Sequence, residues 1–177
     1  MRTVGAILQG GRSTRMGVDK AFVVVDRVTM RASVRAALAM ICDGIVQLGG
    51  PGDGIDPVVA DPGDGPLLAV LELLRTGLGD RYVVVAVDQP LLDAATLGRL
   101  LELTLDDDGG VCFADEPLPC VLPAGARARV EALARAGERR LRALATTTLA
   151  PTPAERRAIV NVNTAADLAR LAGAGHV

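Results

Sequence analysis

Short apolar runs alternate with longer amphipathic segments through the first hundred residues of the chain. Runs of apolar, β-branched residues predict strands, and apolar residues that recur every three or four positions predict helices. The predicted strands are Thr3–Leu8, Ile45–Leu48, Pro57–Ala60 and Arg81–Val87, and the predicted helices are Met30–Met40, Leu67–Leu74 and Asp93–Leu103. This alternation is typical of an α/β domain. The unbroken apolar run Val83–Val87 indicates a largely parallel sheet that is covered on both faces.

The second half of the chain continues the pattern with shorter elements. Strands are predicted at Val111–Ala114, Pro119–Leu122 and Ile159–Val162, and helices at Ala124–Ala136, Glu138–Leu144 and Ala165–Leu171. Asn163 and Thr164 are residue types that cap a helix N-terminus. The chain has 177 residues and no linker-like segment, which predicts a single domain over residues 1–177.

Composition argues against several classes of protein. Hydrophobic residues make up 50% of the chain and charged residues 23%, which is typical of a folded domain rather than a disordered chain. The net charge of -2 and the 2% of aromatic residues argue against a nucleic acid partner. No apolar stretch approaches the roughly 20 residues of a membrane span, so no membrane partner is expected. Cys42, Cys112 and Cys120 form no Cys-x-x-Cys pair, so we expect buried, reduced thiols in a cytoplasmic protein.

The loop that follows the first predicted strand carries the strongest chemical signal. Ligands of α/β domains bind at the carboxyl edge of the sheet, where such a loop lies. Gly10 and Gly11 allow backbone N–H groups to approach an anion closely, and Arg15 and Lys20 supply two cations for a triphosphate. The loop has neither a Walker A ending nor the Gly-x-Gly-x-x-Gly of dinucleotide-binding folds. On residue type alone, phosphate binding and a plain solvated loop are comparable interpretations.

The order of residues in this loop resembles a long family signature. The string Leu8-Gln9-Gly10-Gly11-Arg12-Ser13-Thr14-Arg15-Met16-Gly17-Val18-Asp19-Lys20 is similar to Leu-x-Gly-Gly-x-Ser-x-Arg-Met-Gly-x-Asp-Lys. That signature is typical of the molybdenum cofactor guanylyltransferase family, the MobA-like nucleotidyltransferases. Five later stretches resemble the family in the same order, namely Asp61 with Gly65-Pro66-Leu67, Asp88-Gln89-Pro90, Pro117–Leu122, Gly137–Leu141 and Asn161–Leu168. The resemblance therefore covers essentially the whole chain.

The resemblance implies a Rossmann-like three-layer α/β/α nucleotidyltransferase fold. The implied reaction transfers GMP from GTP to the phosphate of molybdenum-bound molybdopterin, with Mg²⁺ as the cofactor and pyrophosphate as the leaving group. Molybdoenzymes or other proteins of cofactor biosynthesis are the further partners that it suggests. By the same resemblance, residues of four stretches take part. Leu8, Gln9, Gly10 and Gly11 contact the nucleotide, and Lys20 of the same string binds the triphosphate. Asp61 reaches the nucleoside, Asp88 holds magnesium, and Asn161 and Asn163 face the acceptor.

The chemistry of nucleotidyl transfer agrees with these roles. The reaction needs charge neutralisation and an attacking oxygen held in line with the α-phosphorus. Asp88, at the end of the most strand-like run, suits a magnesium ligand, and Arg15 suits the leaving pyrophosphate. Structural interpretations stay open for Asp61 as a turn residue, for Arg15 in a salt bridge and for Asn163 as a helix cap.

Two other functions also stay open. One is a sister nucleotidyltransferase that uses CTP or a different phosphorylated acceptor, and the other is a catalytically silent nucleotide-binding homologue. The resemblance favours guanine, because this chain has Gly10-Gly11 and the Asn-x-Asn at 161–163 where the cytosine-using relatives tend to have Ala-Gly and Asp-x-Asp. The presence of both Lys20 and Asp88 favours an active enzyme over a silent one.

The chain departs from the family pattern at three places near the expected nucleotide site. Gln9 stands where the family usually has Ala, and Gly49 and Gly50 stand where the family has an Asn. Ala69 stands where the family has Gly.

Overall fold

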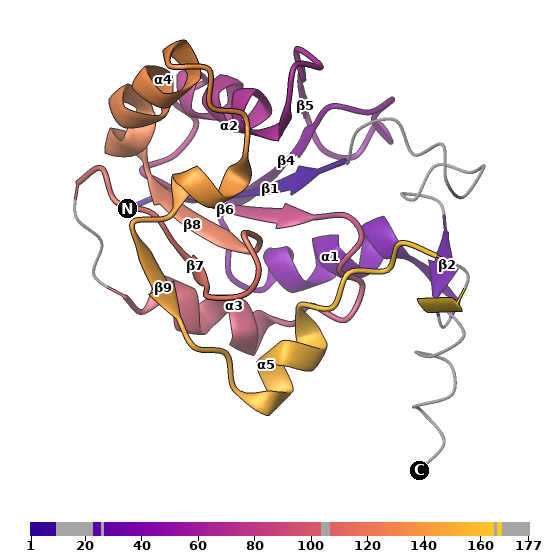
Figure 1. Cartoon of the computed structure of the whole chain (residues 1–177). Helices are drawn as coiled ribbons and strands as arrows, with labels where there is room; N and C mark the ends of the chain where they lie inside the picture. The colour runs from indigo at the N-terminus through magenta and orange to yellow at the C-terminus, as the bar shows by residue number, and fades with distance from the viewer. Residues whose placement is uncertain (10–22, 26, 104–106, 165, 168–177) are drawn as a thin grey trace.

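A seven-stranded sheet runs through the middle of the described structure (Figure 1). The computed structural model describes residues 1–9, 23–25, 27–103, 107–164 and 166–167. Within these residues the strand order is β5-β4-β1-β6-β8-β7-β9. The strands are β1 (Thr3–Leu8), β4 (Gly44–Leu48), β5 (Val58–Val59), β6 (Arg81–Ala86), β7 (Val111–Phe113), β8 (Cys120–Pro123) and β9 (Thr147–Leu149). A separate antiparallel ribbon pairs β2 (Val24–Val25) with β3 (Val28–Thr29).

The strand directions bring distant parts of the chain to one edge of the sheet. β1 pairs in parallel with β4 and β6, and β4 pairs in parallel with β5. β8 is antiparallel to both β6 and β7, whereas β7 is parallel to β9. The turn from β7 to β8 therefore lies at the same edge as the carboxyl ends of β1, β4 and β6. The prediction of a mostly parallel sheet is confirmed.

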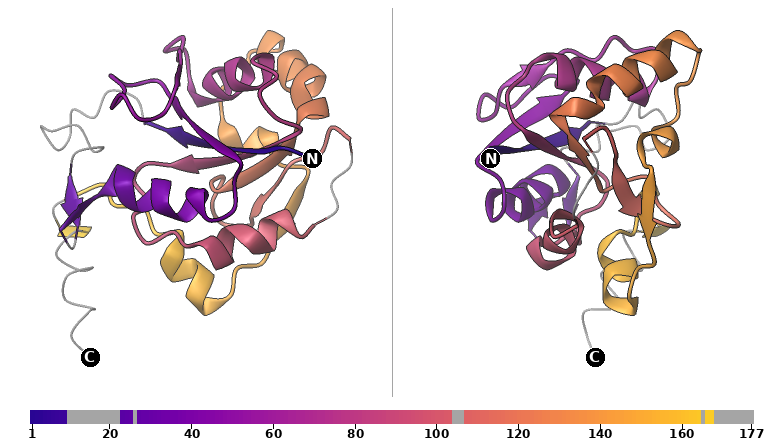
Figure 2. Two further views of the ribbon diagram at one scale, coloured as in Figure 1. Left: turned by 180° about the vertical axis from the view of Figure 1, so that it is seen from behind. Right: turned by 90° about the vertical axis from the view of Figure 1, so that its left-hand side faces the viewer.

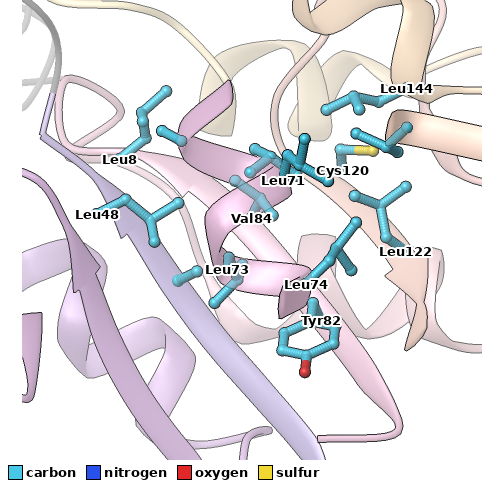
Figure 3. Close-up of a cluster of buried hydrophobic side chains, with 14 of the residues drawn as sticks. Leu8, Leu48, Leu71, Leu73, Leu74, Tyr82, Val84, Cys120, Leu122 and Leu144 are labelled. Atoms are coloured by element: carbon cyan, nitrogen blue, oxygen red, sulfur yellow. The ribbon is translucent and has the colours of Figure 1, made fainter. Parts of the chain in front are cut away.

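Helices cover both faces of the sheet, which confirms the three-layer α/β/α architecture (Figures 1 and 2). α2 (Pro66–Arg75) and α4 (Arg127–Arg135) lie on one face, and α1 (Met30–Ala39) and α3 (Ala94–Leu101) lie on the other. Under α2, apolar side chains such as Leu8, Leu71 and Leu122 form one core (Figure 3). A second core under α1 and α3 includes Ile7 and Val85. None of the described helices has the length and apolar character needed to cross a membrane.

The predicted helices begin where their sequence signals place them. The Thr29 hydroxyl accepts a hydrogen bond from the N–H of Ala32 at 3.2 Å and caps α1. Pro66 is the first residue of α2, and the Asp93 carboxylate accepts from the N–H of Thr96 at 2.7 Å at the start of α3. The predicted helix at Asp93–Leu103 is confirmed as α3, although Asp93 caps the helix rather than being its first residue.

The three cysteines are free, and Cys112 and Cys120 are buried while Cys42 is half-buried. Burial raises the pKa of the Cys42 thiol to about 12, and burial likewise raises the pKa of Cys112 and Cys120. The thiols therefore stay protonated at neutral pH and act as small apolar side chains, as the sequence predicts.

The prediction of a last strand at Ile159–Val162 is wrong. These residues have no strand pairing. Ile159 and Val162 are both buried although they are three positions apart, and residues at that spacing in a strand point to opposite faces. The strand that pairs with β7 at the edge of the sheet is β9. The sequence analysis predicted neither β9 nor α5 (Pro153–Ala158).

Two other predicted helices differ in detail. The predicted helix Ala124–Ala136 is a short 3-10 turn at Ala124–Ala126 followed by α4, and the predicted helix Glu138–Leu144 is a 3-10 turn at Leu141–Leu144. Most of the helix predicted at Ala165–Leu171 lies outside the described residues. At its expected start, the Thr164 hydroxyl accepts from the N–H of Asp167 at 3.1 Å.

Candidate active site

A cavity of about 420 Å³ opens at the edge of the sheet where β1 and β6 end. Its apolar lining comes from Leu8, Pro66, Ala86, Val87, Pro117, Leu118 and Leu141, and its polar lining from Asp61, Asp88, Gln89, Glu116, Asn161 and Asn163. Five residues that the sequence assigned to the site therefore meet in one cavity, namely Leu8, Asp61, Asp88, Asn161 and Asn163. The volume is within the range of small-molecule sites in proteins.

Asp88 lies in the middle of this arrangement, two residues beyond the end of β6. Its backbone is fixed, because its carbonyl accepts a hydrogen bond from the N–H of Val162 at 2.7 Å. On the preceding residue, the N–H of Val87 donates to the carbonyl of Leu8 at 3.1 Å. Asp61 comes from the loop after β5, and Glu116 from the turn between β7 and β8, so these two carboxylates belong to opposite halves of the sheet.

Asp61 is held by a turn and by close packing against a glycine. Its Oδ1 accepts a hydrogen bond from the N–H of Gly63 at 2.8 Å. Gly49 has a φ of 71°, and a Cβ on it would lie 2.9 Å from the Cβ of Asp61. The Cβ of an Asn at this position would collide with Asp61. The departure from the family pattern at Gly49 thus has a physical reason in this chain.

Gln9 presents its backbone, rather than its side chain, at the edge of the sheet. The N–H of Gln9 donates to the carbonyl of Leu48 at 3.1 Å. Its side chain donates to Gln47 at 2.8 Å, and Gln47 donates in turn to the Asp53 carboxylate at 2.5 Å. A Cβ on Gly50 would lie 2.7 Å from the Gln9 Oε1, so the Gln9 carboxamide fills the space that this glycine leaves. The side chain of Gln9 is absent from the described lining of the cavity.

Asn161 and Asn163 line the cavity although their segment is not a strand. The Nδ2 of Asn161 donates to the Oε2 of Glu116 at 3.1 Å. Sequence analysis missed Glu116, because nothing in its neighbourhood along the chain marks it. Only its contact with Asn161, 45 positions away, brings it to the site.

Gln89 is the second residue that sequence analysis missed. It is fully buried, and its Nε2 donates to the carbonyl of Leu118 at 2.9 Å and to that of Ile159 at 3.1 Å. These two bonds tie the segments that carry Glu116 and Asn161 to the end of β6. Gln89 therefore positions one wall of the cavity beside Asp88.

We expect Gln89→Leu to lower the free energy of unfolding by about 3 kcal/mol, because two buried carbonyls would lose their donor at about 1–3 kcal/mol each. Urea denaturation of the variant and the wild type measures this loss. An exposed polar change such as Glu102→Gln should stay within about 0.5 kcal/mol of the wild type. A Gln89→Leu protein as stable as the wild type would contradict the role given to these two bonds.

The described lining of the cavity is acidic. It includes the carboxylates of Asp61, Asp88 and Glu116 and no Lys, Arg or His side chain. The cations predicted for the site, Arg15 and Lys20, lie outside the described residues, as do Gly10 and Gly11. Within the described part of the chain, no three side chains of the His, Cys, Asp or Glu type form a ready-made metal site. A polyanion would enter this cavity only with cations that the described lining does not supply.

Curated relatives match nearly the whole chain. The chain is 34% identical over 191 residues to a probable molybdenum cofactor guanylyltransferase of Mycolicibacterium paratuberculosis, and the match covers 98% of this chain and 97% of that protein. It is also 34% identical over 178 residues to a molybdenum cofactor guanylyltransferase of Xanthomonas euvesicatoria, covering 94% and 93% of the two chains.

Solved structures share the fold. A nucleotidyl transferase from Methanothermobacter thermautotroptrophicus superposes with a TM-score of 0.72 at 23% identity, over 96% of this chain and 95% of that one. The molybdopterin-guanine dinucleotide biosynthesis protein A of Archaeoglobus fulgidus superposes with a TM-score of 0.69 at 22% identity, over 94% and 95%. These likenesses agree with the resemblance found in the loop after β1. A family model described as the MobA-like NTP transferase domain matches residues 5–155, and the chain belongs to this family.

Proposed function

We propose that this protein is a nucleotidyltransferase that moves GMP from GTP to the phosphate of molybdenum-bound molybdopterin and releases pyrophosphate. The observation that carries the proposal is the single cavity that gathers Leu8, Asp61, Asp88, Asn161 and Asn163 from distant parts of the chain. Full-length relatives at 34% identity bear the name of that activity. The experiment that tests it is formation of the guanine dinucleotide product and pyrophosphate from GTP and molybdopterin.

In this proposal the two halves of the sheet serve the two substrates. Leu8, at the end of β1, and Asp61, in the loop after β5, lie on the β4 side of Asp88, and we assign the nucleotide to that side. Glu116 belongs to the turn between β7 and β8, and Asn161 is hydrogen-bonded to it. We assign the acceptor to this side, with Asn163 as a further contact from the lining. Asp88 then lies where the α-phosphate and the attacking oxygen meet. Such an arrangement holds the reacting atoms in line, which supplies a large part of the catalysis of phosphoryl transfer.

Mg²⁺ is the metal that the chemistry of the described residues fits best. Carboxylate oxygens are hard ligands, and Mg²⁺ in proteins usually takes one or two carboxylates and completes its shell with substrate phosphates and water. Asp88 would hold the ion from the protein side, which requires no cluster of three ligating side chains. When bound, Mg²⁺ neutralises phosphate oxygens that would otherwise be repelled by the acidic lining of the cavity.

The residues of the first loop complete the proposed nucleotide site. We assign Lys20 to the triphosphate, Arg15 to the leaving pyrophosphate, and Gly10 and Gly11 to backbone contacts with the nucleotide. Leu8 and Gln9 contribute backbone groups at the end of β1. Molybdoenzymes or other proteins of cofactor biosynthesis are the expected recipients of the product, and a cytoplasmic location stays a prediction.

We expect GTP to be preferred over CTP and ATP by at least about tenfold in kcat/KM. Backbone groups that pair with the edge of guanine would be left unpaired by adenine at about 1–3 kcal/mol per group, and cytosine would leave part of a purine site empty. Initial rates with each nucleotide, at one concentration of Mg²⁺ and acceptor, measure the preference. If CTP is used at least as well as GTP, the enzyme is a cytidylyl-transferring sister of the proposed one. Binding of nucleotide without turnover of any acceptor would indicate a silent homologue.

A further inference from the structure

Glu116 places a carboxylate in the acceptor half of the cavity without a cationic partner among the described residues. It lines the cavity, and its one side-chain hydrogen bond with another described residue is the 3.1 Å bond that its Oε2 accepts from Asn161. None of the ion pairs between described residues includes Glu116. The neighbouring Asp115, by contrast, pairs with Arg156 at 2.5 Å outside the cavity. Of these two adjacent carboxylates, Asp115 forms an ion pair outside the cavity and Glu116 faces the cavity.

The Glu116 carboxylate is held in place by its surroundings. The N–H of Glu116 donates to the carbonyl of Phe113 at 3.3 Å, which closes the turn after β7. Two residues further on, the carbonyl of Leu118 accepts from the buried Gln89 at 2.9 Å. Asn161 fixes one carboxylate oxygen from the other side. A carboxylate fixed in this way is suited to ligand recognition, because its orientation is set before the ligand binds.

The surroundings of this carboxylate indicate what it binds. Pro117 and Leu118 follow Glu116 directly along the chain, and together with Leu141 they add apolar surface to the same cavity, which suits the face of a flat heterocycle. A carboxylate accepts two parallel hydrogen bonds when two N–H donors lie side by side. It repels a phosphate, so we place the phosphate of the acceptor toward Asp88, where the proposed Mg²⁺ would offset the charge of that carboxylate.

A pterin ring has the matching edge. Its 2-amino group and its N3–H are adjacent donors on one side of a flat bicyclic system. Guanine carries the same pair of donors, but the proposed nucleotide position lies on the other side of Asp88, beside Asp61. The geometry therefore favours the pterin of the acceptor over the guanine of GTP as the partner of Glu116.

We propose that Glu116 is a specificity-determining residue that accepts hydrogen bonds from the 2-amino group and N3–H of the acceptor pterin. Asn161 acts as a positioning residue that orients the Glu116 carboxylate. This assignment rests on the proposed function, and it adds the residue that distinguishes a pterin from other flat rings.

Equilibrium binding tests the assignment on the full chain. Metal-free molybdopterin, kept reduced under anaerobic conditions, and GTP with MgCl₂ are titrated separately, both followed by calorimetry, into the wild type, Glu116→Gln and Asp115→Asn. Gln accepts from Asn161 as Glu does, but it turns an N–H₂ toward the ligand donors. We expect Glu116→Gln to weaken molybdopterin binding by about 10- to 100-fold and to leave GTP binding within about twofold. Asp115→Asn, the matched control, should change neither.

A second titration tests whether Glu116 recognises the 2-amino group of the pterin. A 6-substituted pterin and the lumazine with the same substituent, which has a carbonyl in place of the 2-amino group, compete with molybdopterin. The wild type should prefer the pterin by about tenfold or more, and Glu116→Gln should lose this preference. Asn161→Ala should also reduce the preference for the pterin over the lumazine, and its melting temperature should stay unchanged. A purely structural role of Asn161 would not alter the selectivity between the two rings.

The outcomes separate the two levels of the proposal. Equal binding of molybdopterin by Glu116→Gln and the wild type overturns the role of Glu116 and leaves the proposed function standing. If Glu116→Gln instead loses GTP binding, Glu116 lies at the nucleotide, and its proposed role in pterin recognition is overturned as well. If the wild type binds GTP but not molybdopterin, the proposed acceptor is wrong, and the role of Glu116 falls with it.

Discussion

Asp88→Asn should reduce the rate of guanylyl transfer at saturating GTP by about 100-fold or more and should raise the Mg²⁺ concentration needed for half of the maximal rate. The neutral amide is a poorer ligand for a hard cation, and loss of one strong interaction with the charge of the transition state costs about 3 kcal/mol. The fold should survive, because the part of Asp88 that bonds to Val162 is its backbone carbonyl, which the substitution keeps.

The measurement is a titration of Mg²⁺ at fixed GTP and acceptor, with the initial rate of pyrophosphate release as the readout. Glu102→Gln serves as the control, because Glu102 lies outside the cavity. It also follows directly on α3, far from the carboxyl edge of β6. An Asp88→Asn enzyme with the metal dependence of the wild type would remove Asp88 from the metal site.

Lys20→Ala should lower kcat/KM for GTP by about two to four orders of magnitude. A triphosphate has to enter a cavity whose described lining carries three carboxylates and no cation, so a fixed positive charge from the first loop is needed. Loss of such a contact typically costs about 3–5 kcal/mol in the transition state. Lys20→Arg should recover part of the activity, because it keeps the charge but changes the geometry of its donors.

Lys20 is also the only lysine of the chain, which permits a test without mutagenesis. A lysine-selective acylating reagent should inactivate the enzyme, and GTP with Mg²⁺ should protect it, since a bound triphosphate shields the amine. Peptide mapping distinguishes acylation of Lys20 from acylation of the N-terminal amine. Turnover of Lys20→Ala within about threefold of the wild type would refute its assignment to the triphosphate.

The local features of the fold were predictable because their signals lie within a few residues of each other. The apolar spacing predicted the starts of α1, α2 and α3 to within one residue, and in the structure the side chains of Thr29 and Asp93 cap α1 and α3. The buried strands β1 and β6 followed from their apolar runs. The strand expected at Ile159–Val162 failed for a reason that is not local, because β9 occupies the edge beside β7 and the N–H of Val162 bonds to the carbonyl of Asp88.

The sequence by itself determined the order of the main strands and helices, the α/β class and, through the string from Leu8 to Lys20, the family. It also named five of the residues that line the cavity, because each lies in a motif. Only the tertiary structure decided that Glu116 meets Asn161 and that Gln89 ties both of their segments to the end of β6. These bonds join residues 29 to 70 positions apart, and such pairing depends on which strands share an edge of the sheet rather than on the neighbours of each residue along the chain.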